Sequence, residues 1–554
     1  MSNIPLSEYP RPQLIRDSYQ CLNGLWDYEI IGDGVNKSGK ILVPYSPETP
    51  TSGVNHILQP NEKLIYNKGI KWDGDFDPSR EKLILHFGAV DYIADIFIDG
   101  TKALTHRGGY LPFEVILDKA EFDLRVEVED PSDTKEQTRG KQKLNHGGIW
   151  YTPQSGIWQT VWMEKVPNTY IEKIKLEPDL TGFFLTVKTN KPKELIKVYI
   201  EGKYHEFPSC QRYRVDIENP ELWSPENPRL YTMIIESECD KVESYVGLRT
   251  FSTGLDSNGN KVLTLNGKPY FHHGVLDQGY YYPGLYTPSS DEEMVNDIKI
   301  MKELGFNTLR KHIKVEPLRW YSYCDKLGIL IWQDMVTGGG KYKFPIISAP
   351  LVLGSFLKDN HYSLFARKDK AMRDEWKKEA IEMMEHLENV TSLAMWVPHN
   401  EGWGQFDSAD FTKTMKSIDP SRTIDHASGW HDQKIGDFKS LHVYFKKYKF
   451  KKDKLNRAVI LTEFGGYGLK LEDHMTTEKT FVYKDFGTKE ALTDAIVNLY
   501  RTEILPAKEQ GLAADIYTQV SDVEEEVNGL ITFDRKEVKV IKEKFAEIKK
   551  MLRV

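Results

Sequence analysis

The sequence predicts a multidomain protein in which two β-sandwiches precede a C-terminal (β/α)8 barrel, also called a TIM barrel. Up to about residue 250, short runs rich in Ile, Val and Phe are separated by Gly, Asp and Pro, which is typical of strands. From about residue 260, helical and strand-like segments alternate over roughly 250 residues, the size of such a barrel. The chain has 554 residues, 40% of them apolar and 28% charged, so it can bury several large cores.

The charge balance and the cysteines exclude several classes of protein. There are 82 acidic against 74 basic residues, a net charge of −8, so we expect neither a nucleic acid nor a membrane as partner. No apolar run approaches the ~20 residues of a membrane span. The four cysteines lie far apart without a CxxC motif, which argues against a disulfide framework or a zinc knuckle. The opening residues lack the features of a signal peptide, which predicts a cytoplasmic protein, or a periplasmic one whose export signal has been removed.

The first half of the chain is predicted to form two all-β domains, at residues 1–167 and 168–254. Residues 124–130 (LRVEVED) alternate with period two, which indicates a half-buried strand. Other strand-like runs lie at 84–90, 92–100, 113–117, 171–177, 183–189, 196–200 and 231–238. Turn residues at 220–228 (PELWSPENP) interrupt this series, and two sandwich-sized domains fit it better than one.

Residues 255–554 are predicted to form the barrel. Ser290 and Glu293 predict a capping box that opens a helix, in which Met294, Ile298 and Met301 recur at helical spacing. Gly305 ends this helix before a strand, and the same order of helix, glycine and strand follows at once, as in parallel βαβ units. The eight candidate strands are YFHHGV (270–275), FNTLRKH (306–312), ILIWQD (329–334), LAMWVPHNE (393–401), RTIDHAS (422–428), LHVYF (441–445), AVILTEF (458–464) and AADIYTQ (513–519).

A barrel of this kind carries its active site at the C-terminal ends of its strands. The polar residues at these ends are Arg310, Asp334, Asn400, Glu401, His426, Tyr444, Glu463 and Gln519. Glu401 and Glu463 each follow an apolar strand, where a carboxylate is unusual. Two facing carboxylates are what glycoside hydrolysis needs: one protonates the leaving oxygen, and the other attacks the anomeric carbon or activates water. Their separation, about 5–5.5 Å or about 6.5–9.5 Å, distinguishes retention from inversion.

The flanking residues also fit a sugar site. Trp403, Trp430 and Tyr444 are aromatics near predicted strand ends that can stack on sugar rings, with core packing as the alternative. Asn400 can bind a sugar hydroxyl, and Arg310 can hold Glu463 ionised, with a structural ion pair as its alternative.

Other chemistries lack their motifs. GGGK at 338–341 is not a P-loop, and no HExxH or GxSxG motif occurs. His272 and His273 point to opposite faces of one strand, so they cannot bind one metal together. We expect neither a metal nor a cofactor. The acidic run at 524–526 is interpreted as a solvated surface or as the rim of the site.

Nearly the whole chain resembles glycoside hydrolase family 2, the family of β-galactosidases, β-glucuronidases and β-mannosidases. The matching segments are LNGLWDYEI (22–30), VDYIADIFIDGTKALTHRGGYLPFE (90–114), SGIWQTVWMEKV (155–166), ELWSPENPRLY (221–231), VGLRTF (246–251), NGKPYFHHGV (266–275), PHNEGWGQFD (398–407) and TEFGGYG (462–468). The resemblance implies a jelly-roll sugar-binding-like domain at 1–167, an immunoglobulin-like sandwich at 168–254 and a catalytic TIM barrel at 255–554.

The resemblance also implies roles for single residues. Glu401 matches the general acid/base, Asn400 its hydroxyl-binding neighbour and Glu463 the nucleophile. Arg310 matches the arginine beside the nucleophile, and Tyr444 the tyrosine that hydrogen-bonds it. The family retains configuration through a covalent glycosyl-enzyme, so Glu401 is expected to have a raised pKa and Glu463 to stay ionised.

Several positions depart from the family pattern. VLDQGYYYPGLY places Asp277 and Gln278 where the family has Arg or Lys followed by His-Glu, and Gln519 stands near the expected tryptophan of strand eight. Asn528 occupies the position of the lysine with which uronidases bind the sugar carboxylate, so no buried cation is expected for a uronic acid. These differences predict a sugar pocket built from Asp277, Gln278, Gln519 and Asp522.

The leading hypothesis is a retaining exo-β-glycosidase that acts on an oligosaccharide or glycoside, with β-galactosidase-like activity as the first choice. The alternatives are an α-L-arabinosidase, a β-mannosidase or a β-glucuronidase, a non-catalytic carbohydrate-binding protein, and an unrelated metal-dependent hydrolase. A homo-oligomer is an open alternative to a monomer. The long segment 335–370 is expected to border the substrate entrance.

Overall fold

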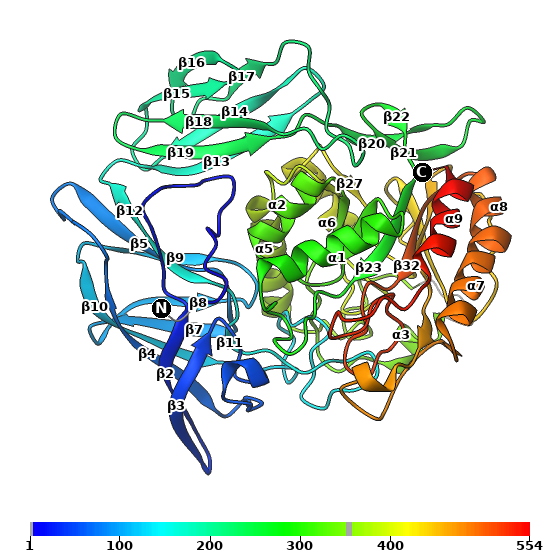
Figure 1. Ribbon diagram of the computed structural model, residues 1–554, viewed down its shortest axis with the longest axis horizontal. Helices are drawn as coiled ribbons and strands as arrows, with labels where there is room; N and C mark the ends of the chain where they lie inside the picture. The colour runs from blue at the N-terminus through cyan, green and yellow to red at the C-terminus, as the bar shows by residue number, and fades with distance from the viewer. Residues whose placement is uncertain (1–3, 351–356, 554) are drawn as a thin grey trace.

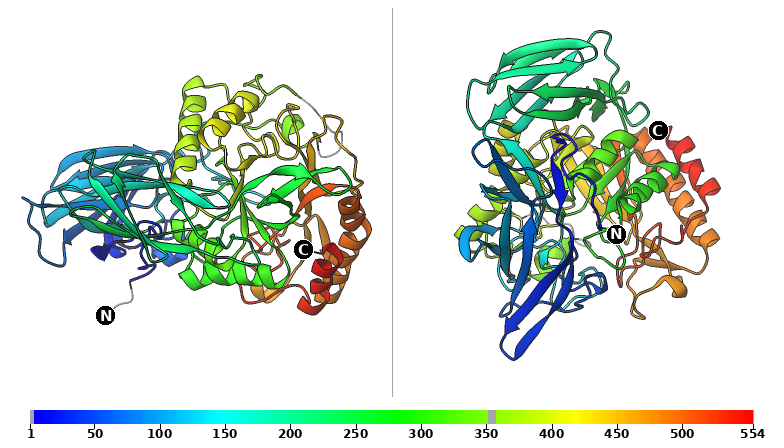
Figure 2. Two further views of the ribbon diagram at one scale, coloured as in Figure 1. Left: turned by 90° about the horizontal axis from the view of Figure 1, so that it is seen from above. Right: turned by 60° about the vertical axis from the view of Figure 1, so that its left-hand side comes forward.

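The predicted fold class is confirmed by the structure, a computed structural model that describes residues 4–350 and 357–553. Two β-sandwiches, coloured blue to green, lie beside a barrel that is surrounded by helices (Figure 1). The two further views show the same arrangement, with the N-terminal sandwich and the barrel side by side (Figure 2). No helix of the described segments is long and apolar enough to cross a membrane.

The N-terminal sandwich consists of a four-stranded and a six-stranded sheet. The first has the order β1 (Tyr19–Cys21), β12 (Val161–Pro167), β5 (Glu81–Phe87), β9 (Phe113–Leu117). The second has the order β3 (Val35–Val43), β2 (Gly24–Gly32), β4 (Lys63–Lys71), β10 (Glu121–Glu129), β7 (Ile93–Ile98), β8 (Thr101–Arg107). Phe122, Leu124, Val126 and Val128 of β10 are buried in turn, which confirms the predicted half-buried strand.

The second sandwich has three strands in one sheet and four in the other. They are β13 (Ile171–Pro178), β14 (Gly182–Thr189) and β17 (Tyr213–Asp216), and then β16 (Lys203–Pro208), β15 (Leu195–Ile200), β18 (Tyr231–Glu236) and β19 (Lys241–Val246). All these strand pairs are antiparallel, and Ile174, Leu185, Val198 and Ile235 pack between the sheets. Alternate residues of the strands in both sheets point inward, and these buried side chains form the core.

The barrel is one eight-stranded parallel sheet, and all eight predicted strands belong to it. Its order is β27 (Thr423–Ile424), β26 (Leu393–Val397), β25 (Leu330–Asp334), β24 (Thr308–Lys311), β23 (His272–Asp277), β32 (Leu512–Thr518), β29 (Ala458–Gly465), β28 (Phe438–Val443). A small sheet of β20 (Phe251–Leu255), β21 (Lys261–Leu265) and β22 (Lys268–Pro269) adds Val262 and Leu263 to the barrel interior. It packs near Gly511, where β32 begins, so it closes the N-terminal end and leaves the C-terminal end for a site.

Helices cover the outside of the barrel (Figure 1). They include α1 (Asp291–Glu303), α2 (Leu318–Leu327), α5 (Lys370–His386), α6 (Ser408–Ile418), α7 (Lys489–Leu499), α8 (Leu505–Glu509) and α9 (Lys542–Leu552). Met294, Ile298 and Met301 of α1 are fully buried, as predicted. The predicted capping box is wrong by one residue: the side chain of Ser290 makes no capping bond, and the backbone N–H and hydroxyl of Ser289 donate to Glu293 instead.

Candidate active site

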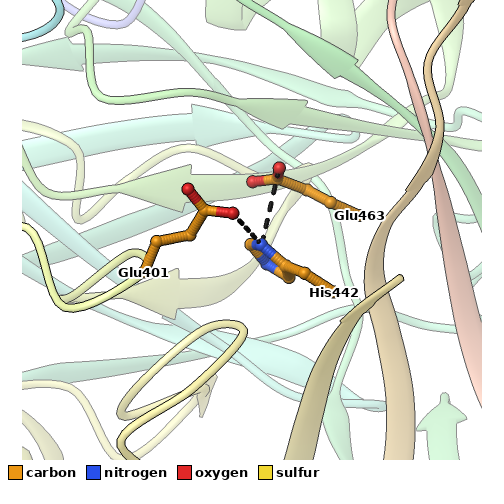
Figure 3. A group of neighbouring side chains, drawn as sticks. All are labelled: Glu401, His442 and Glu463. Carbon is orange, nitrogen blue, oxygen red and sulfur yellow. Dashed lines mark hydrogen bonds and ion pairs between the residues drawn. The ribbon is translucent and has the colours of Figure 1, made fainter. Parts of the chain in front are cut away.

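Glu401 and Glu463 face each other across His442 at the C-terminal end of the barrel (Figure 3). His442 Nδ1 lies 2.7 Å from Glu401 Oε1 and 3.5 Å from Glu463 Oε2. One side-chain atom of each of the three residues lies within 4.8 Å of the others. The two carboxylates that the sequence singled out therefore share one small site.

Glu463 lies in β29, and its carboxylate is bound on both oxygens. Arg310 Nη1 donates to Oε1 at 3.1 Å, and the Tyr444 hydroxyl donates to Oε2. Arg310 also donates twice to Asp334 at 3.0 Å and once to Asn400 Oδ1 at 2.8 Å. Burial opposes the charge of this arginine, but Asp334 and Glu463 outweigh burial and raise its pKa, so it stays cationic beside Glu463.

Glu401 lies on a tight turn that follows β26. Its φ is +51°, and its backbone N–H donates to Ser428 O at 2.9 Å. Gly402 follows with φ +73°, and a Cβ there would lie 2.6 Å from His431 Cδ2. The glycine after Glu401 is therefore required both by its backbone conformation and by the lack of space.

The carboxylate of Glu401 is also bound on both oxygens. Trp403 Nε1 donates to Oε2 at 3.0 Å, and His442 lies at Oε1. Trp430 Nε1 donates to the backbone oxygen of Glu401 at 2.7 Å. Burial alone raises the pKa of Glu401, but the contacts with His442 and Trp403 outweigh it and lower this pKa. The expected raised pKa is therefore wrong for this arrangement, because His442 contacts Glu401.

The signal for His442 is present in the sequence. It precedes Tyr444 by two residues in the strand-like run LHVYF, so both side chains leave the strand on the same face. β28 and β29 then pair His442 with Glu463, after a register shift between Leu441 and His442. The contact of His442 with Glu463 depends on which strands are neighbours in the barrel, and that is decided by the topology of the sheet.

The predicted sugar pocket is brought together only in part. Asp277 Oδ2 pairs with Lys311 at 2.7 Å, and Asp522 pairs with Lys539 at 2.7 Å. Gln519 Nε2 donates to Asn528 Oδ1 at 2.6 Å, which leaves its buried Oε1 without a partner among the described residues. The buried Nε2 of Gln278 likewise has no partner there. The two aspartates are thus bound to lysines, while each of the two glutamines keeps a buried polar atom that has no partner among the described residues.

The N-terminal sandwich reaches this site, which the sequence analysis missed. The ring of Trp150 lies 4.5 Å from that of Trp403, and the charge of Lys141 contributes to lowering the pKa of Glu401. The same loop binds the acidic run, which is not a solvated surface. Its contacts run from Thr152 N and Oγ1 to Glu524, from Gly148 N to Glu525 and from the Tyr151 hydroxyl to Glu526.

The segment 335–370 lies at the same end of the barrel, as far as it is described. The ring of Tyr342 is 5.1 Å from that of Trp403, and Ile346 O accepts a hydrogen bond from His431 Nε2 at 2.8 Å. Residues 351–356 of the predicted entrance segment lie outside the described residues.

A cavity of about 710 Å³ lies elsewhere, where the two sandwiches meet the barrel. Arg11, His86, Lys173, Arg319 and His386 line it, and neither Glu401 nor Glu463 does. The paired carboxylates, and not this volume, therefore mark the candidate active site.

Two curated relatives carry the name β-galactosidase. The protein from Halalkalibacterium halodurans is 23% identical over 394 residues, which are 64% of this chain and 35% of that protein. The protein from Thermoanaerobacter pseudethanolicus is 24% identical over 298 residues, which are 49% of this chain and 39% of that protein. The matched part of the chain thus spans little more than a third of these relatives.

Solved structures share the fold over almost their whole length. A GH2 β-galacturonidase from Eisenbergiella tayi bound to galacturonate has a TM-score of 0.72 and 18% identity, with 98% of this chain and 99% of that chain covered. The β-D-glucuronidase of Dictyoglomus thermophilum has a TM-score of 0.74 and 16% identity, with 98% of each chain covered.

The family models match both the barrel and the domain before it. The model "Glycosyl hydrolases family 2, TIM barrel domain" covers residues 258–551, and "Glycosyl hydrolases family 2" covers residues 169–249. The barrel model alone spans more than half of the chain. The chain therefore belongs to glycoside hydrolase family 2.

Proposed function

We propose that the chain is a retaining exo-β-glycosidase that removes a non-reducing-end sugar by double displacement. The observation that carries this proposal is the pair Glu401 and Glu463, with an oxygen of each within 4.8 Å of the other at the mouth of the barrel. This favours the short separation of retaining enzymes, because an inverting enzyme needs room for a water between its carboxylates.

Glu463 is the nucleophile in this proposal. Arg310 donates a charged hydrogen bond to one oxygen of its carboxylate, and the hydrogen bond from Tyr444 to the other oxygen fixes its orientation. It attacks the anomeric carbon while Glu401 protonates the leaving oxygen, and the bond to the aglycone breaks. Water then loses a proton to Glu401 and attacks the same carbon, which releases the sugar and restores both carboxyl groups. Asn400, which precedes Glu401 and accepts a hydrogen bond from Arg310, binds a sugar hydroxyl in this proposal.

A β-galactoside is the first choice of substrate. The two relatives named β-galactosidase support it, and so does the pairing of the buried cations Lys311 and Lys539 with carboxylates, which leaves them unavailable to a uronate. A β-uronide is the second candidate, favoured by one observation. Lys141 is only half-buried, makes no ion pair with any described residue, and lies close enough to Glu401 and Asp334 to affect their pKa values.

A panel of aryl glycosides tests the proposal and the choice of sugar together. The panel contains the β-galactoside, β-glucuronide, β-galacturonide, β-mannoside, β-glucoside and α-L-arabinoside. We expect the wild type to cleave the β-galactoside and Glu463→Ala to cleave none. Binding of saccharides without cleavage by the wild type supports a non-catalytic carbohydrate-binding protein instead, and turnover by Glu463→Ala contradicts the assigned nucleophile.

The variant Lys141→Met separates the two substrate classes. We expect it to keep β-galactoside cleavage within about threefold of the wild type, since a neutral sugar does not need the ammonium group. If the wild type cleaves a uronide and this variant cleaves it at least about a hundredfold more slowly, the second candidate is identified instead. A rate loss of that size corresponds to one lost charged hydrogen bond of about 3 kcal/mol.

A further inference from the structure

Both ring nitrogens of His442 contact polar groups of the site, which packing alone does not require. It is buried, and its Nδ1 lies between the two carboxylates, nearer to Glu401 (Figure 3). Its other ring nitrogen, Nε2, lies 3.0 Å from Ser428 Oγ. A Cβ at Gly429 would lie 2.9 Å from the imidazole, so the ring is also confined sterically.

The hydroxyl groups near Nε2 of His442 bear on whether its Nδ1 accepts or donates a hydrogen bond. Ser428 Oγ donates to Thr462 Oγ1 at 2.9 Å, which leaves its lone pairs to accept a hydrogen bond from Nε2–H. Ser440 Oγ, which donates to Asp425 Oδ2 at 2.8 Å, completes this hydroxyl cluster. In the tautomer with its proton on Nε2, Nδ1 either accepts a hydrogen bond from a protonated Glu401 or, when the ring is protonated on both nitrogens, donates one to its carboxylate.

Glu401 alone does not account for an acid at neutral pH. Burial alone raises its pKa, whereas its contacts with His442 and Trp403 lower it, so the proton of Glu401 cannot be assigned apart from His442. An ordinary histidine keeps its proton about two pH units higher than an ordinary glutamate, at a pKa of about 6.5 against about 4.3. A proton shared by the two groups is therefore retained to a higher pH than one held by Glu401 alone.

We propose that His442 is a positioning residue that shares the catalytic proton with Glu401. The proton that the acid/base gives and takes is therefore held by the pair, and not by Glu401 alone. This inference rests on the proposed function. In the first step Glu463 bonds to the anomeric carbon, the bond from that carbon to the leaving oxygen breaks, and the pair gives one proton to that oxygen. The pair is left as a carboxylate beside a neutral imidazole. In the second step the pair takes one proton from water, the water oxygen bonds to the anomeric carbon, and the bond from that carbon to Glu463 breaks.

The charges around His442 come from several elements. The acidic groups are Glu401, Glu463, Asp334 of β25 and Asp425, which follows β27. The basic groups are Arg310 of β24 and Lys141 of the N-terminal sandwich, and His312 and Tyr444 also titrate nearby. Arg310 is already bound to Asp334 and Glu463, so the carboxylate that His442 neutralises is that of Glu401.

His442→Gln tests this sharing because glutamine is polar but does not titrate. For a glycoside that the wild type cleaves, kcat/KM is measured against pH with a phenyl and a 2,4-dinitrophenyl aglycone. We expect the alkaline limb to move at least about one unit towards acid pH. We expect the phenyl glycoside to lose about 10²-fold, within the range of general acid catalysis, and the dinitrophenyl glycoside, whose leaving group needs little acid help, less than about fivefold.

His273→Gln is the matched control. It changes another buried histidine paired with a carboxylate of the same barrel, Asp515 at 2.8 Å, outside the site. We expect its pH limbs to coincide with those of the wild type. Unchanged limbs in His442→Gln, with equal losses on both glycosides, mean that His442 has only a structural role and overturn the proposal. Activity of the wild type that is lost with a chelator and restored by a divalent cation also overturns it, because the three residues then bind a metal.

A titration that needs no turnover keeps this test separate from the proposed function. The imidazole ¹⁵N signals of His442, assigned by their loss in His442→Gln, are followed with pH in the wild type and in Glu401→Gln. We expect the Nδ1 signal to differ between the two proteins over the pH range followed, since the carboxylate that shares its proton is gone. The same titration in both proteins overturns the proton sharing even if no glycoside is cleaved.

Discussion

Trp150 of the N-terminal sandwich packs against Trp403 of the barrel, with ring centroids 4.5 Å apart at an angle of 62°. Trp403 in turn donates a hydrogen bond to Glu401. Neither tryptophan is fully buried, so both border the space in front of this carboxyl group. The sandwich thus contributes to the candidate active site through an aromatic contact beside Glu401, the proposed acid/base.

Trp150→Ala is expected to weaken the cleavage of glycosides with a flat aglycone. Loss of one stacking face costs about 1.4 kcal/mol, which is about tenfold in kcat/KM, mainly through KM. Trp150→Phe should recover most of this loss. Tyr199→Ala, which removes an exposed aromatic of the second sandwich, is the control and should leave kinetics unchanged. Steady-state kinetics on aryl and methyl glycosides measures this loss. An equal loss of kcat/KM on both kinds of glycoside contradicts a stacking role.

Arg310→Lys is expected to lower kcat by about 10²–10³-fold. A lysine ammonium cannot reproduce the planar set of bonds to Asp334, Asn400 and Glu463, so the nucleophile loses its fixed orientation. Arg249→Lys, at another fully buried arginine that binds the backbone oxygen of Thr391, should affect stability but keep kcat within about threefold. Initial rates and thermal unfolding of both variants separate the two effects, and a wild-type kcat in Arg310→Lys contradicts the assigned role.

Tyr444→Phe is expected to reduce kcat about 10–100-fold with little change in stability. The variant loses the hydroxyl on Glu463 but keeps the ring, which stacks on Tyr483 with centroids 4.1 Å apart. Tyr448→Phe is the control, because that buried hydroxyl makes no hydrogen bond to any described residue. Rates and melting temperatures are measured on both proteins. Similar rates for the two variants would show that the hydrogen bond to Glu463 is dispensable.

Glu164 of β12 is expected to make the junction of the two sandwiches sensitive to acid. It binds Arg11 and Arg16, and Arg16 also pairs with Asp240 of the second sandwich at 2.7 Å. Burial alone raises the pKa of Glu164, but Arg11, His86 and Arg16 outweigh burial and lower it from 4.5 to about 2. A lowered pKa in the folded state stabilises the protein above pH 4.5, and this contribution is lost as the pH falls towards 2.

Glu164→Gln should therefore destabilise the protein by about 3 kcal/mol at pH 7, and by progressively less as the pH falls below 4.5. Urea unfolding at several pH values measures this difference. Asp27→Asn, in an exposed ion pair with Lys40, serves as the control and should cause little change at any pH. A constant difference between Glu164→Gln and the wild type across this pH range contradicts the assigned linkage.

The sequence by itself determined the barrel and its paired carboxylates. Helical spacing in α1, the period-two pattern of β10 and the glycines after α1 and α2 are local features, and local backbone preferences act over a few residues. The same holds for Glu401 and Glu463, since the position of a carboxylate after an apolar strand is visible in a short window. The segments that resemble family 2 fixed the family for the same reason.

The tertiary structure alone decided which side chains meet. Lys539 neutralises Asp522, Lys311 neutralises Asp277, and the N-terminal sandwich binds the acidic run that the sequence analysis interpreted as a solvated surface or as the rim of the site. Each of these contacts depends on burial, because a charge leaves water only where an opposite charge or a hydrogen bond meets it. His442 met Glu463 because the strand order of the barrel placed β28 next to β29, and the turn after β26 brought Glu401 to the same end; no local pattern in the sequence specifies either.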